Sequence, residues 1–157
     1  DGIKPEIADV EPEFFTTTFA NYEIIADENE KVFVFENHIN HNIKTDRTLL
    51  KQLMTILFDN AVKYTEEDGI IKFIVWSKDR SLYLRVSDNG PGINNEDKKK
   101  IFDRFYRVDK ARTRQKGGFG LGLSLAKQIT DSLKGSIIVK DKKPQGVMFE
   151  ARLLANK

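Results

Sequence analysis

The chain has 157 residues, of which 39% are hydrophobic, and carries 26 Lys and Arg against 24 Asp and Glu, a near balance that argues against a nucleic-acid partner. A chain of this length buries about 70% of the surface that its unfolded form exposes, and it has no cysteine, so we expect a core without disulfides or a cysteine-based zinc site. No run of apolar residues exceeds four, whereas a membrane-spanning helix needs about 20.

Two long helices are predicted in the first half of the chain. From Glu11 to Asn29, apolar residues recur at intervals of three and four, which is the period of an amphipathic helix, and Lys31 to Glu36 then has the composition of a strand. Asp46 is expected to cap the second helix, whose apolar positions continue as far as Tyr64. The polar sequence TEEDG ends this helix.

Strands dominate the next part of the chain. The β-rich segments Ile70–Ser77 and Ser81–Ser87 are separated by three polar residues and should pair as a hairpin. A short helix is predicted near Glu96–Phe102. The charged stretch Asp103–Lys116 has no sustained apolar period, which indicates a functional loop.

A third helix and two strands complete the predicted elements. The helix follows the glycines of Gly117–Gly122, and the strands are expected at Ser136–Lys140 and Val147–Leu153. This order of elements favours an α+β fold, a two-layer sandwich with a mixed, mostly antiparallel sheet covered by helices on one face. We expect residues 1–157 to form a single domain.

Asn60, Lys63 and Tyr64 are candidate site residues on the second helix. Their spacing of three and four places them on one helix face, next to the apolar stripe. An amide oxygen suits Mg²⁺, an ammonium group suits phosphate, and an aromatic ring can flank a base. A solvated helix end would carry the same residue types, so this alternative stays open.

The sequence DNGPGI at Asp88–Ile93 is a second candidate. A carboxylate leaves a strand here and enters a turn with two glycines, Gly90 and Gly92, and a helical pattern follows where a hairpin would need a strand. An ionised aspartate only accepts hydrogen bonds, so it favours a base with an exocyclic amine, such as adenine. The alternative is an ordinary Asp-Asn-Gly turn.

The third candidate is the glycine-rich sequence GGFGLGLSLAK, which opens the third helix. Glycines are costly in a helix unless the backbone must approach another group, and a helix N-terminus binds anions such as phosphate. The preceding loop is rich in Lys and Arg, and one or two of these cations could close over a triphosphate. A solvated charged loop is the alternative.

Together, NAVKYT at 60–65, DNGPGI at 88–93, IFDRFYR at 101–107 and GGFGLGLSLAK at 117–127 resemble, in this order, the N, G1, F and G2 boxes of sensor histidine kinases. The resemblance covers nearly the whole chain, and Gly146 suits the last glycine of the family pattern. It implies the Bergerat ATP-binding fold, which gyrase, Hsp90, MutL and histidine kinases share.

The resemblance also implies residue roles. Asn60 would hold Mg²⁺, Lys63 would contact phosphate, Tyr64 would flank the adenine, Asp88 would accept a hydrogen bond from the adenine amine, and Arg107 would reach the γ-phosphate. The remaining ATP-binding positions implied are Gly90, Gly92, Ile93, Phe105, Gly118, Gly120, Leu121 and Gly122. By the same resemblance, Gly90 and Gly92 would shape the base site and Phe105 would join Phe102 in anchoring the lid. The lid hinge and the phosphate-facing helix start would come from Gly118, Gly120 and Gly122.

Two positions depart from the family pattern. Ile56 stands one helical turn before Asn60, where the family usually has Asn and related ATPases have a water-activating Glu, so hydrolysis is not expected as the main reaction. Phe119 stands where the family commonly has Thr, so a hydroxyl contact to phosphate is lost.

The two histidines, His38 and His41, lie in a segment between strands that does not resemble a phospho-accepting helix. The resemblance therefore implies the catalytic and ATP-binding part of a histidine kinase, which uses Mg²⁺ and ATP and phosphorylates a histidine on an upstream dimerisation domain. A cognate response regulator would be the next partner, and the fragment itself would be a monomer. A non-catalytic nucleotide-binding module of the same fold is the alternative.

The chain start, DGIKPEIADVEPE, has neither the basic residues nor the apolar stretch of a signal peptide. We therefore expect this domain in the cytoplasm. The resemblance implies that the whole protein is membrane-anchored.

Overall fold

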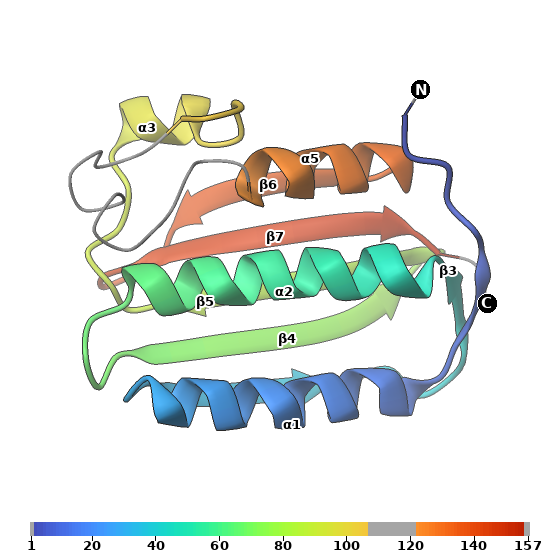
Figure 1. The fold of residues 1–157 in the computed structure, drawn as a ribbon, viewed down its shortest axis with the longest axis horizontal. Helices are drawn as coiled ribbons and strands as arrows, with labels where there is room; N and C mark the ends of the chain where they lie inside the picture. Colours follow the sequence, from blue (N-terminus) through green and yellow to red (C-terminus); the bar gives the residue numbers. More distant parts are fainter. Residues whose placement is uncertain (1, 107–121, 156–157) are drawn as a thin grey trace.

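A five-stranded sheet forms the centre of the computed structural model, which describes residues 2–106 and 122–155 (Figure 1). Its strands, in spatial order, are β2 (Val32–Asn37), β4 (Ile70–Lys78), β5 (Ser81–Asp88), β7 (Val147–Leu154) and β6 (Ser136–Asp141). β2 and β4 are parallel, and the other neighbours are antiparallel. The mixed, mostly antiparallel sheet is thus confirmed, and β5 lies in its middle with a hydrogen-bonded strand on each side.

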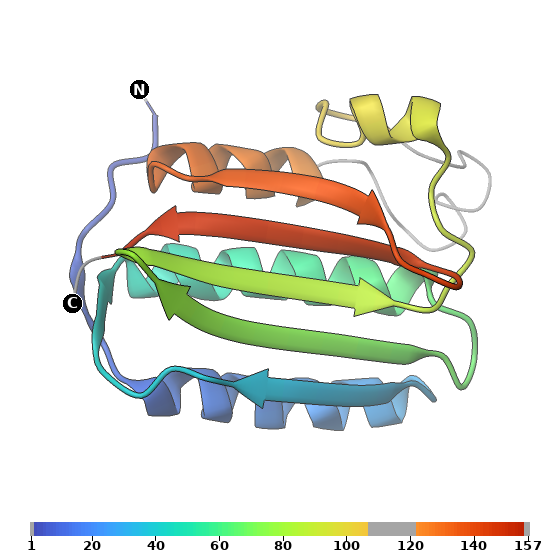
Figure 2. The ribbon, with the colours of Figure 1, turned by 180° about the vertical axis from the view of Figure 1, so that it is seen from behind.

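Three helices cover one face of this sheet. They are α1 (Pro12–Glu28), α2 (Arg47–Tyr64) and α5 (Gly122–Ser132), and the short α3 (Asn95–Lys100) lies beyond one end of the helical layer (Figure 1). Seen from behind, the strands lie in front of the helices (Figure 2). The predicted two-layer sandwich is confirmed. Within the two described ranges, no helix has the length and apolar character that crossing a membrane requires.

The start of α2 is fixed by the predicted cap. Oδ1 of Asp46 accepts a hydrogen bond from the backbone N–H of Leu49 at 2.9 Å, which satisfies a free donor of the first turn. Oδ2 of the same carboxylate accepts one from the backbone N–H of Glu6 at 2.8 Å. One side chain therefore both begins α2 and ties the N-terminal segment to it.

The core lies between the helices and the inner face of the sheet. Along β4, Ile71, Phe73 and Val75 are fully buried, in the alternation expected of a sheet covered on one side. On the helical side, the rings of Tyr22 and Phe58 stack with centroids 4.2 Å apart, joining α1 to α2. This packing holds the C-terminal half of α2 against the sheet.

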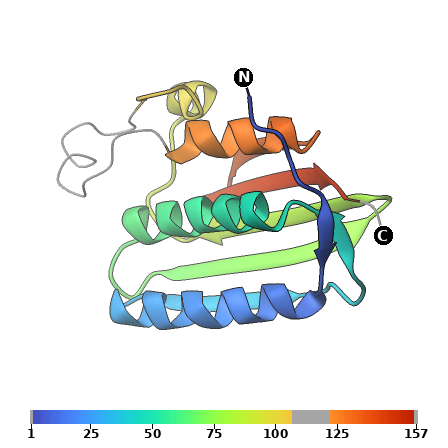
Figure 3. The ribbon, with the colours of Figure 1, turned by 45° about the vertical axis from the view of Figure 1, so that its right-hand side comes forward.

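A second, two-stranded sheet was not predicted. β1 (Ala8–Val10) and β3 (Ile43–Thr45) pair antiparallel beside the start of α2 (Figure 3). Each strand has three residues, which is too short to produce a recognisable alternation in the sequence.

Candidate functional site

The buried carboxylate of Asp88 is at the centre of the candidate site. Asp88 is the last residue of the middle strand, β5, and its exposed fraction is 4%. Oδ1 accepts a hydrogen bond from the backbone N–H of Gly90 at 2.9 Å. Burial raises the pKa of Asp88 above its ordinary value, although backbone N–H groups of Gly90 and Val147 favour the ionised form and partly oppose this shift. A buried acceptor is therefore ready for a hydrogen-bond donor.

Gly90 brings this carboxylate to the end of α2. A β-carbon at position 90 would lie 2.7 Å from the carbonyl oxygen of Tyr64 and 3.2 Å from Oδ1 of Asp88, so the turn after β5 packs directly against the helix end. Any side chain here would push the two segments apart. The predicted candidates on α2 and after β5 therefore belong to one site.

Gly146, just before β7, packs against the same turn. It has a φ of +119°, and a β-carbon there would lie 1.8 Å from the carbonyl oxygen of Asp88. The neighbouring Gln145 donates a hydrogen bond from Nε2 to the carbonyl oxygen of Asn89 at 3.0 Å. Gly92 has its β-carbon position 3.5 Å from the carbonyl oxygen of Gly146. Three segments that are distant in the sequence thus converge around Asp88.

The helix face of α2 with Asn60, Lys63 and Tyr64 borders this junction. Asn60 and Tyr64 are partly buried, whereas Lys63 is exposed. The adjacent Asp59 has its pKa raised by partial burial, and the positive charge of Lys63 opposes that shift. An amide, a cation and an aromatic ring are therefore presented from the last two turns of one helix.

Ile56 contacts the start of α5, a relationship that the sequence did not reveal. A β-carbon at Gly122, the first residue of α5, would lie 3.5 Å from Cγ2 of Ile56. Ile56 stands one turn before Asn60 on α2 and is partly buried against the core. The apolar side chain of Ile56 therefore occupies the face of α2 one turn before Asn60, and α5 begins beside Ile56.

The segment after Gly92 runs along the β7 side of the site. Ile93 and Phe102 pack against the core, and the Phe102 ring meets Phe149 of β7 edge to face, with centroids 6.1 Å apart. Phe105 is 61% exposed, and the guanidinium of Arg104 lies 5.1 Å from its ring centroid. The anchoring role of Phe105 stays a prediction.

Several predicted site residues fall outside the described residues. These are Arg107, Gly118, Gly120 and Leu121. The departure at Phe119 lies in the same segment. Their roles stay predictions.

The residues around Asn60 are compatible with Mg²⁺ but not with a metal held by a protein cage. In ranges 2–106 and 122–155, no group of three or more His, Cys, Asp or Glu residues could hold a metal ion. Mg²⁺ commonly binds through one or two protein oxygens together with waters and substrate phosphates. The amide oxygen of Asn60 is a ligand of this kind.

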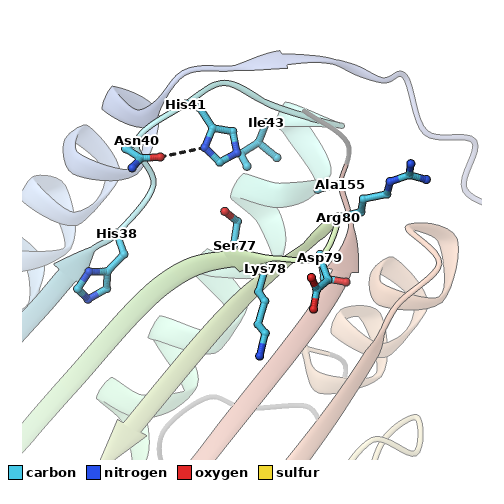
Figure 4. Close-up of a pocket in the computed structure, with 10 residues that line it drawn as sticks. His38, Asn40, His41, Ile43, Ser77, Lys78, Asp79, Arg80 and Ala155 are labelled. Atoms are coloured by element: carbon cyan, nitrogen blue, oxygen red, sulfur yellow. Dashed lines mark hydrogen bonds between the residues drawn. The ribbon is translucent and has the colours of Figure 1, made fainter.

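The two histidines belong to another part of the molecule. His38 and His41 line a pocket of about 320 Å³ between the β2–β3 connection and the β4–β5 turn (Figure 4). His38 pairs with Glu36 at 2.8 Å, and Nδ1 of His41 lies 3.0 Å from Oδ1 of Asn40. The side chains of Lys78 and Arg80 point away from one another, so the two cations are not directed at a common point in the pocket (Figure 4).

Comparison with known proteins identifies the family. Residues 45–157 match the model of the histidine kinase-, DNA gyrase B- and HSP90-like ATPases. The chain belongs to this family. Within it, the chain is an ATP-binding domain of the sensor histidine kinase type: it is 72% identical over 153 residues, 98% of its length, to the sensor protein CiaH of Streptococcus pneumoniae.

Solved structures agree with this assignment. The nucleotide-free catalytic domain of histidine kinase ThkA superimposes with a TM-score of 0.80 at 28% identity, covering 94% of this chain and 97% of that domain. ThkA in complex with the response regulator protein TrrA gives a TM-score of 0.78 at 26% identity, covering 95% of this chain and 42% of that one. The chain spans 34% of the length of CiaH.

Proposed function

We propose that this domain binds Mg²⁺ and ATP and transfers the γ-phosphoryl group of ATP to a histidine on a separate, dimerising helical domain. The observation that carries the proposal is the buried carboxylate of Asp88, on which Gly90 and Gly146 converge. Such an acceptor selects a base with an exocyclic amine, because a carboxylate would repel a carbonyl oxygen at the same place.

The adenine would therefore lie against Asp88 and Gly90, with Tyr64 at its side and the phosphates directed along α2. Lys63 would attract the phosphate charge, and the amide oxygen of Asn60 would hold Mg²⁺ together with phosphate oxygens and waters. When bound, the ion would neutralise charge on the phosphates. The contribution of this chain is positioning: phosphoryl transfer depends mainly on alignment and charge stabilisation.

Water is a poor acceptor in this arrangement. The side chain one turn before Asn60 is Ile56, which can neither deprotonate nor orient a water molecule. A histidine brought by another domain would then accept the phosphoryl group. The complex of ThkA with TrrA supports a response regulator as the protein that next receives it.

The chain covers about a third of the length of CiaH, which leaves room for further domains in a whole protein of that length. We propose that its dimerisation and membrane attachment reside in other segments and that this domain alone is monomeric in the cytoplasm. Sedimentation of the purified chain tests the oligomeric state.

Calorimetric titration with ATP and with GTP, each with and without Mg²⁺, tests the base site. Saturable binding of ATP and at least tenfold weaker binding of GTP are expected. Adding a purified phosphoacceptor helical domain and radiolabelled ATP then tests transfer, since phosphohistidine is labile to acid and stable to base. Binding without transfer to any acceptor would favour the non-catalytic nucleotide module.

A further inference from the structure

The sheet face opposite the helices has the composition of a protein-binding surface. We call it the open sheet face: the outward side chains of β2, β4, β5, β7 and β6, which alternate with the core residues. Among the residues that the structure describes, no helix packs on it, and Figure 2 looks directly onto it. Asp88 points to the other side of the sheet, so this face is separate from the nucleotide site.

The exposed aliphatic side chains of the open sheet face lie mostly towards its two edges, β2 and β6. Nine large hydrophobic residues are exposed in the described ranges, and five of them project from this face: Val32, Val34, Ile70, Ile138 and Leu154. Val32 and Ile70 are register partners on neighbouring strands, so their side chains lie next to each other. Val32, Val34 and Ile70 therefore form one apolar cluster at the β2 side of the face, and clustered apolar residues of this kind indicate an interaction site.

The middle of this face carries three residue types that dominate protein interfaces. Trp76 on β4 and Tyr83 on β5 stack with centroids 5.0 Å apart and an interplanar angle of 3°. The guanidinium of Arg85 lies 4.8 Å from the Trp76 ring centroid, and its Nε donates to Glu150 at 2.9 Å. Trp, Tyr and Arg are enriched where binding energy concentrates, and here they are held in place before any partner arrives.

The open sheet face is positively charged. Five cations project from it, Lys72, Lys78, Arg85, Lys140 and Arg152, against two acids, Glu36 and Glu150. Both acids are already paired, Glu36 with Lys72 at 3.1 Å and Glu150 with Arg85. Within the described ranges, Lys78, Lys140 and Arg152 form no ion pair. Carboxylates of a partner would complement these three cations.

We propose that the open sheet face binds a folded protein whose surface presents carboxylates around an apolar centre. A second copy of the chain fits poorly, because two positive faces would meet. A single-stranded nucleic acid fits poorly too, since bases stack on free aromatic faces and Trp76 is covered by Tyr83 and Arg85. A bilayer would have to cover the ion pair of Glu150 with Arg85 in the middle of the face and that of Glu36 with Lys72 nearer the β2 edge.

Photo-crosslinking in cells that naturally contain the whole protein tests this proposal. The chain is produced with p-benzoylphenylalanine in place of Tyr83, in place of Ile138 or, as a control, in place of Gln128, which is exposed on α5 at the helical side. We expect one protein adduct of defined mass from the first two positions and none from Gln128. The captured protein is then purified and titrated into the unmodified chain.

The titration includes charge-reversed variants. Added salt should weaken binding of the unmodified chain. The double variant Lys140→Glu with Arg152→Glu should weaken binding about tenfold or more, whereas Lys51→Glu on α2 should have little effect. Unchanged ATP affinity and unfolding temperature show that the variants are folded. Equal binding by all variants would overturn the proposal.

Other occupants give distinct results. An adduct between two copies, together with concentration-dependent sedimentation, would replace the partner with a second chain. The purified chain is also mixed with phosphatidylcholine vesicles that contain phosphatidylglycerol, and with a single-stranded oligonucleotide. Binding to the vesicles that the same charge reversal abolishes would mean that the face binds a membrane and not a protein. Binding to the oligonucleotide with the same sensitivity would mean that it binds a nucleic acid. The absence of any adduct from Tyr83 and Ile138 would exclude the proposed surface.

Discussion

Gly146 packs so closely against Asp88 that a β-carbon at position 146 would lie 1.8 Å from the Asp88 carbonyl oxygen. Asp88 ends β5 and Gly146 lies just before β7, the strand that pairs with β5, so their contact brings the loop before β7 onto the turn after β5. This contact fixes the backbone around the candidate base site before any ligand binds. Preorganisation of this kind lowers the entropy lost on binding.

Gly146→Ala should therefore damage both stability and ATP binding. A residue with a side chain at a φ of +119° costs about 1–3 kcal/mol, and the overlap with Asp88 adds to this cost. Gly122→Ala is the matched control, since its β-carbon would meet Ile56 at an ordinary 3.5 Å. Thermal unfolding should show a large loss for the first variant and a change within about 1 kcal/mol for the second. Similar losses in both would contradict the close contact.

Asp88→Asn should separate binding from stability. The amide can present its NH₂ group to the adenine amine and loses a charge-assisted hydrogen bond, so ATP affinity should fall by about 1.5–3 kcal/mol, or about ten- to a hundredfold. The fold should remain, because the group removed is a buried charge. Asp79→Asn, in the exposed β4–β5 turn, is the control. Calorimetric titration with ATP measures the affinity of both variants. If Asp88→Asn bound ATP as tightly as the parent does, the adenine would not lie against Asp88.

The raised pKa of Asp88 predicts a pH dependence of stability. Between the ordinary value of 3.8 and the raised value, the folded protein binds the Asp88 proton more tightly than the unfolded chain does. This group's contribution to the free energy of unfolding therefore decreases as pH rises through that window. Urea unfolding of the parent and of Asp88→Asn should differ most above the raised pKa and converge as pH falls. A constant difference would mean that burial does not perturb this carboxyl.

Asn60→Ala should reduce the effect of Mg²⁺ on ATP affinity. Asn60 is the protein oxygen ligand proposed for the ion, so its loss leaves Mg²⁺ to phosphates and waters. ATP titrations with and without Mg²⁺ measure the ratio of affinities, which should fall severalfold towards one. Gln52→Ala, exposed two turns earlier on α2, controls for changes in the helix. An unchanged ratio would move the metal site away from Asn60.

Asp46→Ala should destabilise the fold by about 1–2 kcal/mol. The variant loses the cap of α2 and the hydrogen bond to the Glu6 backbone. Asn94→Ala is a matched control, because Asn94 caps the exposed six-residue α3 through the Asp97 N–H at 2.8 Å. Urea unfolding should show a clearly larger loss for the Asp46 variant. Equal effects would mean that the Asp46 contacts add nothing to an ordinary cap.

The long elements could be predicted from sequence because their signals are periodic. The apolar repeat before Tyr64 and the polar turn between Ser77 and Ser81 specified α2 and the β4–β5 hairpin to within a residue or two at each end. The three-residue strands β1 and β3 have no such repeat. Their pairing depends on long-range contacts, such as Ala8 with Thr45, that no local pattern contains.

The candidate site was only partly predictable for the same reason. The motif residues Asn60 and Asp88 stand out by their chemistry, whereas their proximity depends on how Gly90 meets the Tyr64 carbonyl oxygen. The departure at Ile56 was visible in the sequence, but its contact with Gly122 joins residues 66 positions apart and appears only in the folded chain.

The central position of β5 has a consequence for hydrogen exchange. Amides of a strand bonded on both sides exchange only when the sheet opens, so those of β5 should exchange among the slowest in the domain. Asp88 belongs to this strand, so a nucleotide bound to Asp88 would stabilise the central part of the sheet, which is expected to unfold last. Occupancy of the site should then slow exchange at amides of β4 and β7 that never contact the ligand.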